Sequence, residues 1–256
     1  MPNKVEWDKV KVRCSNLGRL LTEPKSKADK EAGKLSATAQ IMLREMYVQL
    51  KYDRKKDVET KYMTKGNLVE EESITRISLF DNVLYQKNEE LISNDFIQGT
   101  PDIYLGKSVY EADVISDAKS SYDLVTFVSN VGEELDKGYR WQVLGYMWIS
   151  GAKKGSVDYV LNDLPQIMLF DEMRRLMYKM NAATEESPEY KAAVEVLKKQ
   201  YTYKDIPEEE RILRFPVVRD EDAIGRIEEY VIKARTWLAE FEDKHLNHNR
   251  TLVYIP

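Results

Sequence analysis

Apolar residues recur at helical spacing in several long stretches of the chain, with polar residues between them. The clearest stretch follows Ser36, which we expect to act as the N-cap of a helix. The same periodicity predicts helices at residues 35–53, 66–79, 139–152, 166–182, 188–200 and 223–246. The helix at 66–79 is expected to be opened by Gly66. The two helices that follow Pro165 are separated by an acidic turn and are expected to form an appendage.

Shorter runs of apolar residues predict the strands. They lie at residues 96–105, 109–119, 155–163 and 211–220. A turn around Gly106-Lys107-Ser108 would fold the first two into a hairpin, whereas the Lys- and Ala-rich segment 25–34 is expected to be a flexible loop. The order of helix, strand, strand, helix and strand predicts an α/β protein with helical flanks.

Composition narrows the classes of protein and of site. The chain has 256 residues, of which 43% are hydrophobic, so it can form one large domain. Cys14 is the single cysteine, which excludes a disulfide framework and a cysteine-based zinc site and leaves only thiol catalysis open. With two histidines, acid–base chemistry is expected to fall to carboxylates, lysine or metal-bound water. The sequence shows neither a membrane-spanning apolar run nor the apolar centre of a signal peptide, which indicates a cytoplasmic location.

Charge is distributed unevenly along the chain. The net charge is −5, but residues 1–65 carry 16 Lys/Arg against 9 Asp/Glu and are therefore basic. The tract from Lys51 to Lys56 can contact phosphates through Arg54, Lys55 and Lys56, or it is an ordinary solvated helix end.

Three charged residues stand out in the predicted hairpin. Asp117 and Lys119 are two apart on a strand, so they project from the same face while Ala118 points away. The hairpin would bring Asp102, at the start of its first strand, toward Asp117. Such a cluster is of a size to hold a metal ion, and the composition favours metal-assisted hydrolysis.

These residues resemble a known nuclease signature. Gly99-Thr100-Pro101-Asp102, then fourteen residues, then Asp117-Ala118-Lys119 is similar to the motif of the PD-(D/E)XK nucleases. Upstream, Gly66-Asn67-Leu68-Val69-Glu70 resembles the G-x-x-x-E helix of lambda-exonuclease-like (YqaJ-type) phage recombinases, and the segment from Lys11 to Leu21 is similar to the opening of phage exonucleases. Downstream, Gln142-Val143-Leu144-Gly145-Tyr146 resembles the Q-h-x-x-Y helix of RecB-type members. The resemblance covers roughly residues 10–161.

The resemblance implies a fold and a domain organisation. The fold is a restriction-endonuclease-like core, in which helices flank a central mixed β-sheet, with a C-terminal helical extension. Residues 1–256 would form a single nuclease domain with its core at about 10–161, followed by a helical appendage and a final strand and helix at about 162–256.

The resemblance also implies the roles of individual residues. Asp102, Asp117 and Glu70 would bind Mg²⁺, with Mn²⁺ as a substitute, and the backbone carbonyl of Ala118 would complete the shell. Lys119 would orient the attacking water or help to deprotonate it. Glu71 is the alternative to Glu70 if the helix begins elsewhere. Gln142 and Tyr146 would position the lysine or contact DNA.

The function implied is that of a Mg²⁺-dependent DNA nuclease. Its leading form is a 5′ to 3′ double-strand exonuclease of a phage or prophage, active in recombination or repair in the host cytoplasm. A single-strand exonuclease and a structure-specific endonuclease are alternatives within the superfamily. A non-catalytic DNA-binding or assembly module is the alternative from another class. DNA, a single-strand annealing protein and further copies of the chain are the implied partners, and no membrane is among them.

Three other candidate sites have plainer interpretations. His245 and His248 are three apart and could bind a transition metal, but the end of an exposed helix is the simpler assignment. Residues 151–156 lack the ending of a phosphate-binding loop and are expected to form a turn. Ser15 could hold a terminal phosphate of DNA or cap a helix.

Overall fold

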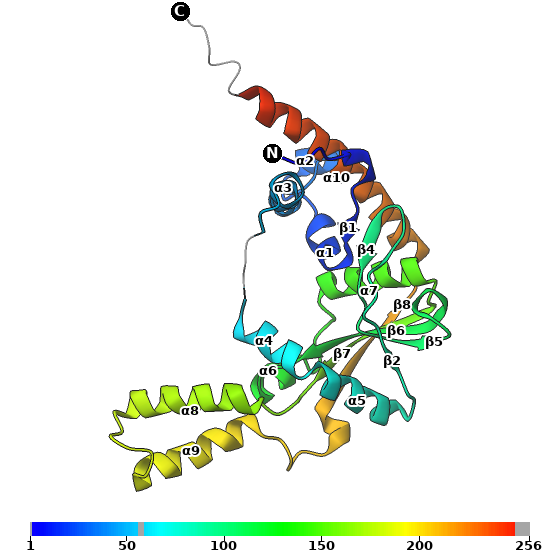
Figure 1. Cartoon of the computed structure of the whole chain (residues 1–256). Helices are drawn as coiled ribbons and strands as arrows, with labels where there is room; N and C mark the ends of the chain where they lie inside the picture. Colours follow the sequence, from blue (N-terminus) through cyan, green and yellow to red (C-terminus); the bar gives the residue numbers. More distant parts are fainter. Residues whose placement is uncertain (1, 56–58, 249–256) are drawn as a thin grey trace, which may run out of the picture.

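Strands from the middle and the end of the chain form a five-stranded mixed sheet, and three short strands form a second sheet (Figure 1). The computed structural model describes residues 2–55 and 59–248. Its strands are β1 Val12–Arg13, β2 Gln86–Lys87, β3 Ile92–Ser93, β4 Ile97–Gly99, β5 Ile103–Gly106, β6 Ala112–Ser120, β7 Lys154–Val160 and β8 Ile212–Val218. Its α-helices are α1 Leu17–Leu20, α2 Lys27–Glu31, α3 Ala37–Tyr52, α4 Lys61–Leu68, α5 Glu70–Asp81, α6 Leu124–Val128, α7 Lys137–Ser150, α8 Gln166–Met180, α9 Pro188–Tyr201 and α10 Glu221–His248.

The larger sheet has the order β2-β5-β6-β7-β8. β5 and β6 pair antiparallel, which confirms the predicted hairpin, while β6 and β7 are parallel. The connection between the parallel strands contains α6 and α7, as a parallel pair requires a crossover. The smaller sheet has the order β1-β4-β3, with β1 parallel to β4. The predicted central mixed sheet flanked by helices is confirmed.

Helices cover both faces of the larger sheet. α7 lies on one face, and α1, α3 and α10 pack beyond it (Figure 1). α5 lies on the other face, where Ile74 and Ile77 pack against Ile103, Val160 and Ile212. Each sheet face therefore has its own apolar core, and the polar residues of the central strands are enclosed between layers.

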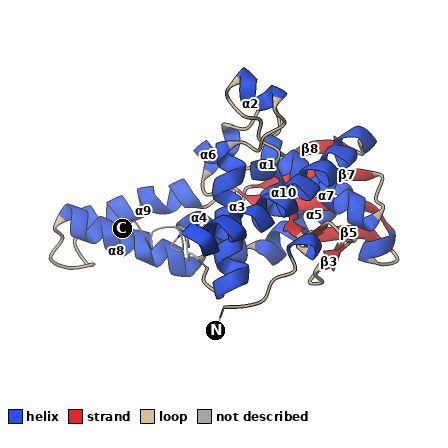
Figure 2. Cartoon of the chain, turned by 90° about the horizontal axis from the view of Figure 1, so that it is seen from above, coloured by secondary structure: helices blue, strands red, loops and turns tan. Residues whose placement is uncertain are grey.

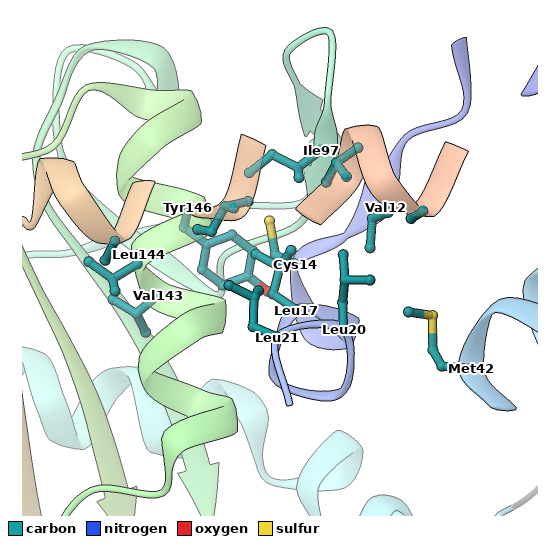
Figure 3. Close-up of a cluster of buried hydrophobic side chains, with 14 of the residues drawn as sticks. Val12, Cys14, Leu17, Leu20, Leu21, Met42, Ile97, Val143, Leu144 and Tyr146 are labelled. Carbon is teal, nitrogen blue, oxygen red and sulfur yellow. The ribbon is translucent and has the colours of Figure 1, made fainter. Parts of the chain in front are cut away.

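α7 is fixed at both ends and along its buried face. The Asp136 carboxylate caps its N-terminus by accepting from the Gly138 and Tyr139 amides at 2.7 and 3.2 Å, and Gly151 ends the helix with φ of 78°. Figure 3 shows Tyr146 of this helix beside Cys14 and Leu17, with Val143 and Leu144 on another side of the helix but in the same buried cluster. This packing fixes the rotation of α7 about its axis.

Two glycines allow close approach in this cluster. A Cβ on Gly99 would lie 2.5 Å from the Tyr146 ring, and a Cβ on Gly145 would lie 2.6 Å from Leu17. β4 and α7 can therefore pack more closely than any side chain at these positions would allow.

Four sequence predictions need correction at their boundaries. The predicted strand 96–105 is two strands in different sheets, because Pro101 lacks an amide hydrogen and interrupts the ladder. The predicted helix 66–79 begins at Glu70, and Gly66 lies inside the preceding helix α4. The segment 25–34 contains α2, which Ser26 caps, so it is not simply a loop. The predicted strand 211–220 is preceded by a turn and begins at Ile212.

The end of the chain contributes to both the core and an arm. β8 pairs with β7, and buried residues of α10 pack in the same core as α1 and α7. α8 and α9 form a helical hairpin that projects from the rest of the molecule in both views (Figures 1 and 2). In the described ranges, every helix is too short or too polar to cross a membrane.

Candidate active site

Asp117 and Lys119 lie on the face of β6 that is covered by α7. Asp117 is 1% exposed, and its Oδ2 is in direct ion-pair contact with the Lys119 ammonium. Its Oδ1 accepts a hydrogen bond of 3.0 Å from the Gln142 amide, which also donates to the Tyr146 hydroxyl at 2.9 Å. The predicted sharing of one strand face is confirmed, and α7 holds the acid from behind.

Asp102 lies where the chain leaves the smaller sheet and enters the larger one. Its Oδ2 accepts a hydrogen bond of 2.7 Å from the Ala118 amide, so the side chain extends the β5–β6 ladder by one bond. Asn88 holds the backbone on either side, since its amide donates to the Asp102 carbonyl at 2.9 Å and its side chain donates to the Pro101 carbonyl at 3.0 Å. Both aspartates are therefore fixed relative to the residue between Asp117 and Lys119.

The three glutamates at the start of α5 point in different directions. Glu70 lines a cavity with Asp102, Ala118 and Lys119. Glu71 forms an ion pair of 2.6 Å with Lys87, and Glu72 forms one of 2.9 Å with Arg76. Lys87 also lies 3.6 Å from Glu70. Of the three acids, the structure places Glu70 at the cavity.

The cavity has a volume of about 500 Å³. Acidic and basic groups occupy one part of its lining, and hydroxyls and aromatic rings occupy the rest. Its lining includes Tyr62, Glu70, Asp102, Lys119, Ser120, Ser121, Tyr139 and Tyr159. A larger hollow of about 630 Å³ lies around residues 216–222, but the ion pair there, Arg140 with Asp220, is well exposed to solvent. Buried charge favours the smaller cavity as the reactive site.

Burial changes the protonation of this cluster. Desolvation, with the nearby Asp117 charge, raises the pKa of Asp102 to about 7. Desolvation also raises the pKa of Asp117, although the Lys119 ammonium opposes the shift. For Lys119, burial lowers the pKa, but the two aspartates outweigh it and the net pKa is raised. Lys119 is therefore a cation at neutral pH in this arrangement. Its single positive charge does not balance the negative charges of both aspartates.

The two aspartates fit a hard divalent cation. Asp117 Oδ2 is buried and accepts no hydrogen bond of good geometry from the residues that the structure describes. Carboxylate oxygens are the ligands that Mg²⁺ prefers, and added positive charge would relieve the desolvation of both acids. Within the described ranges, however, no three His, Cys, Asp or Glu side chains gather closely enough to hold a metal ion. The expected three-carboxylate cluster is thus reduced to an aspartate pair, with Glu70 on the same cavity.

The other predicted residues have varied positions. Ser15 is exposed, and the N-cap position of α1 is Asn16, so Ser15 does not cap that helix. Arg54 and Lys55 are exposed after α3, where Lys55 lines a separate hollow with Arg19, and Lys56 lies outside the described residues. Tyr146 is 3% exposed, which suits the positioning role rather than a contact with DNA.

Cys14 and His245 are occupied in packing. The Cys14 thiol is fully buried and desolvation raises its pKa, which disfavours thiol catalysis. His245 Nδ1 lies 3.0 Å from the Tyr47 hydroxyl, and its ring packs against aromatic side chains. This contact supports the simpler interpretation of the two histidines.

The sequence patterns did not predict that Ser120 and Ser121, which follow Lys119, line the cavity, or that Lys65 holds the backbone beside them. Ser120 and Ser121 line the cavity, and the fully buried Lys65 donates to backbone carbonyls beside them. The position of the serines directly after Lys119 was an available signal, because a strand that carries one cavity residue delivers its next residues to the same end of the sheet. Lys65 gave no such signal, since its partners come from remote segments.

Solved structures show the same fold. A phage-related exonuclease from Haemophilus somnus 129PT is 29% identical over 93% of this chain and 97% of that chain, with a TM-score of 0.69. An alkaline exonuclease from Laribacter hongkongensis is 16% identical over 97% and 99% of the two chains, with a TM-score of 0.59. The structure of that protein in complex with dAMP is 15% identical over 97% of this chain and 99% of that chain, with a TM-score of 0.58.

Neither a protein-family model nor a curated protein sequence matches the chain. The likeness to the Laribacter structures is one of fold, whereas the Haemophilus protein is also similar in sequence. The fold and this similarity are consistent with the resemblance of the motif residues to the lambda-exonuclease-like (YqaJ-type) PD-(D/E)XK nucleases.

Proposed function

We propose that this nuclease is a Mg²⁺-dependent deoxyribonuclease that removes nucleotides from the 5′ ends of double-stranded DNA, in phage recombination or repair. The observation that carries the proposal is the ion pair of the buried Asp117 with the partly exposed Lys119, with Asp102 beside it, at a cavity that Glu70 also lines. The similarity to a phage-related exonuclease supports the exonuclease form.

Asp102 and Asp117 would hold Mg²⁺ or Mn²⁺, with the Ala118 carbonyl as a further oxygen ligand and Glu70 on the wall of the same cavity. The bound ion would supply positive charge to the phosphodiester and acidify a water molecule. Lys119, a cation between the acids and the cavity, would orient the attacking water and offset the charge of the phosphate. Gln142 would keep the Asp117 carboxylate in one orientation through its hydrogen bond.

Cleavage assays on three forms of one DNA test the proposal. With Mg²⁺, linear duplex should be degraded to nucleotides, while closed circular DNA should stay intact. The extent to which nicked DNA is degraded should differ from that of both other forms. EDTA should stop the reaction. A 5′-labelled and a 3′-labelled duplex should lose label at different rates, because a 5′ to 3′ enzyme releases the 5′ label first.

Each other outcome assigns a different function. Cleavage of closed circles would replace the exonuclease with an endonuclease. Intact DNA in all three forms, under conditions in which the folded protein binds DNA, would favour the assembly module that partners a single-strand annealing protein. Activity that persists in EDTA would contradict the metal requirement.

A further inference from the structure

Lys65 is a fully buried cation that donates its hydrogen bonds to backbone carbonyls. The side chain belongs to α4 and is 0% exposed. Its ammonium donates to the carbonyls of Ser121 and Asn162 at 2.7 Å and to that of Tyr122 at 3.0 Å. A protonated lysine has three donors and no acceptor, so three carbonyls match it fully. A neutral side chain of the same length could not make this set of bonds.

The acids nearest to Lys65 are engaged elsewhere. Asp163 and Glu72 pair with arginines at 3.3 and 2.9 Å, and Asp123 caps the N-terminus of α6. Desolvation lowers the pKa of Lys65 to about 8, against the attraction of these three acids. Lys65 therefore stays a cation at neutral pH, although burial makes its charge costly. A buried apolar side chain would avoid this cost, so the charge points to a requirement for the three hydrogen bonds.

The three carbonyls lie just beyond the ends of two neighbouring strands. Ser121 and Tyr122 follow β6, the strand that carries Asp117 and Lys119, and Asn162 follows β7. The two strands pair in parallel, so both of them end at the same edge of the sheet. The ammonium therefore ties α4 to the edge at which the reactive strand ends.

The side chain of Asn162 extends this connection to α5. Its amide nitrogen donates to the Ser73 hydroxyl at 2.6 Å, and its Oδ1 accepts from Arg76 Nε at 3.1 Å. Ser73 and Arg76 both lie in α5, the helix that begins with Glu70. Asn162 and Ser73 are buried, so water does not compete for the bond between them. A chain of hydrogen bonds thus runs from Lys65 to the helix of Glu70.

We propose that Lys65 is a positioning residue of the nuclease site, which holds the wall of the cavity formed by α4 and α5 at a fixed place relative to β6. The residues of this wall are Tyr62, Met63, Gly66, Asn67, Glu70 and Ser73. The role rests on the proposed function, because the residues that it aligns are those assigned to cleavage. Lys65 is absent from the described lining of the cavity, so it acts through its neighbours and not on the substrate.

Cleavage kinetics of Lys65→Met test the proposal. Methionine keeps the length of the side chain but removes all three donors, so the wall can shift relative to β6. The kcat on linear duplex DNA should fall roughly tenfold or more, because small displacements of reacting groups slow a reaction strongly. KM for DNA should change less than about threefold, since the buried side chain does not reach the substrate. A change in KM alone, with kcat intact, would overturn the proposal.

A double-mutant cycle with Glu70→Gln separates positioning from a loss of stability. All rates are measured below the melting temperature of every variant. Because Lys65 acts through the placement of Glu70, the double variant Lys65→Met/Glu70→Gln should be no slower than the slower single variant. Reductions in kcat that multiply would show that Lys65 acts independently of Glu70 and would overturn the proposal.

Arg235→Met is the matched control. Arg235 of α10 also donates to backbone carbonyls, those of Val10 at 2.9 Å and Asp95 at 2.5 Å, and it lies outside the described lining of the cavity. The substitution should lower the melting temperature and leave kcat unchanged. An equal loss of kcat in Arg235→Met and Lys65→Met would overturn the assignment, because it would show that any lost bond to a carbonyl slows cleavage.

Asn162→Ala breaks the same connection at its second step. It keeps the carbonyl that Lys65 bonds and removes the two bonds to α5, while Ser73 and Arg76 retain other partners. It should lower kcat about threefold and couple to Glu70→Gln in the same way. If Lys65→Met does not fold, this variant decides the proposal, and an unchanged kcat would overturn it.

Amide hydrogen exchange gives a measurement that does not need activity. In Lys65→Met, protection should fall in the first two turns of α5 and at the end of β6, while α3 and α10 should keep wild-type protection. Unchanged protection in α5 would overturn the positioning role even if the wild type cleaves DNA. A wild type that leaves DNA intact, with protection lost in the variant, would overturn the nuclease proposal and support the connection from Lys65 to α5.

Discussion

Two buried aspartates on neighbouring strands of one sheet have opposite surroundings. Asp158 of β7 is fully buried and accepts from Arg214 at 2.6 and 3.2 Å, from Ser116 at 2.5 Å and from Ser156 at 3.0 Å. Asp117 of β6 accepts one hydrogen bond, from Gln142, and otherwise faces the Lys119 ammonium. Ser116 and Ser156 share the sheet face of Asp158 toward α5, whereas Asp117 faces α7.

The difference separates a structural acid from a reactive one. Arg214 also bonds Asp81 at 2.6 Å, so the Asp158 network fixes the C-terminal end of α5 on the sheet while Glu70 lies at the other end of that helix. Both oxygens of Asp158 are satisfied by the fold itself. Asp117 Oδ2 has only the ion pair with Lys119 and accepts no hydrogen bond of good geometry from the described residues, and Lys119 must also balance the charge of Asp102, which is the condition under which a metal ion can add binding energy.

The largest expected effect is on cleavage. Asp102→Ala, Asp117→Ala and Lys119→Ala should each reduce kcat by roughly a thousandfold or more, because the three residues act as one unit. Steady-state assays on linear duplex DNA measure the loss. Asp113→Ala is the matched control, since this exposed acid lies on the same strand away from the cavity lining, and it should keep full activity. Retained activity in any of the three variants would remove that residue from the assignment.

Stability should change in opposite directions at the two aspartates. Asp158→Asn should lower the free energy of unfolding by about 3 kcal/mol, because it leaves part of the Arg214 charge unpaired in the interior. Asp117→Asn should leave it unchanged or raise it in EDTA, since desolvation already disfavours that charge. Urea unfolding curves of both variants in EDTA measure the comparison. Equal losses would mean that Asp117 is as structural as Asp158.

Divalent metal should stabilise the folded protein through Asp117. Mg²⁺ at about 100 times its dissociation constant should raise the free energy of unfolding by roughly 2.7 kcal/mol, provided that it binds only the folded state. Thermal melts with Mg²⁺ and Mn²⁺ would show the shift, and Asp117→Asn should reduce it. Ca²⁺ is expected to shift the melt without supporting cleavage, because its looser coordination positions water poorly. A shift of equal size in wild type and variant would place the metal elsewhere.

The raised pKa of Asp102 predicts a pH dependence of stability in EDTA. Because this pKa is about 7 in the folded protein and 3.8 for an ordinary solvated aspartate, the folded protein binds more protons between these values. The protonated Asp102 carboxyl therefore contributes its full stabilisation below about pH 4, and this contribution is lost as the pH rises through 7. The free energy of unfolding should fall by on the order of 2 kcal/mol over this range, a value reduced because Asp102 is partly exposed and because its charge interacts with that of Asp117. Asp102→Asn should remove this part of the pH profile. An unchanged profile in the variant would contradict the raised pKa.

The smallest effect concerns the glutamates at the start of α5. Glu70→Gln should lower kcat about tenfold, since its carboxylate lines the cavity, whereas Glu71→Gln should change it less than about twofold. The matched pair keeps helix length and side-chain volume. A larger loss in Glu71→Gln would assign the cavity position to the other glutamate.

Local patterns in the sequence were enough for much of the fold. The periodicity after Ser36 and around Val143 predicted α3 and α7, and strand alternation placed Asp117 and Lys119 on one face. These features follow from backbone geometry within a few residues, which a single stretch of sequence contains. The turn around Gly106-Lys107-Ser108 likewise predicted the hairpin that brings Asp102 to β6.

Only the tertiary structure decided which polar groups are satisfied. Asp117 and Asp158 are both acids in apolar strands, and only the approach of Arg214 from β8 and of Gln142 from α7 distinguishes them. In the same way, the ion pair with Lys87 draws Glu71 away from the cavity, and Lys65 fixes a wall made by two strand ends. Such partners are remote in the chain, and the free energy of a buried polar group depends on what lies within hydrogen-bond distance in space, so periodicity and spacing contain no record of it.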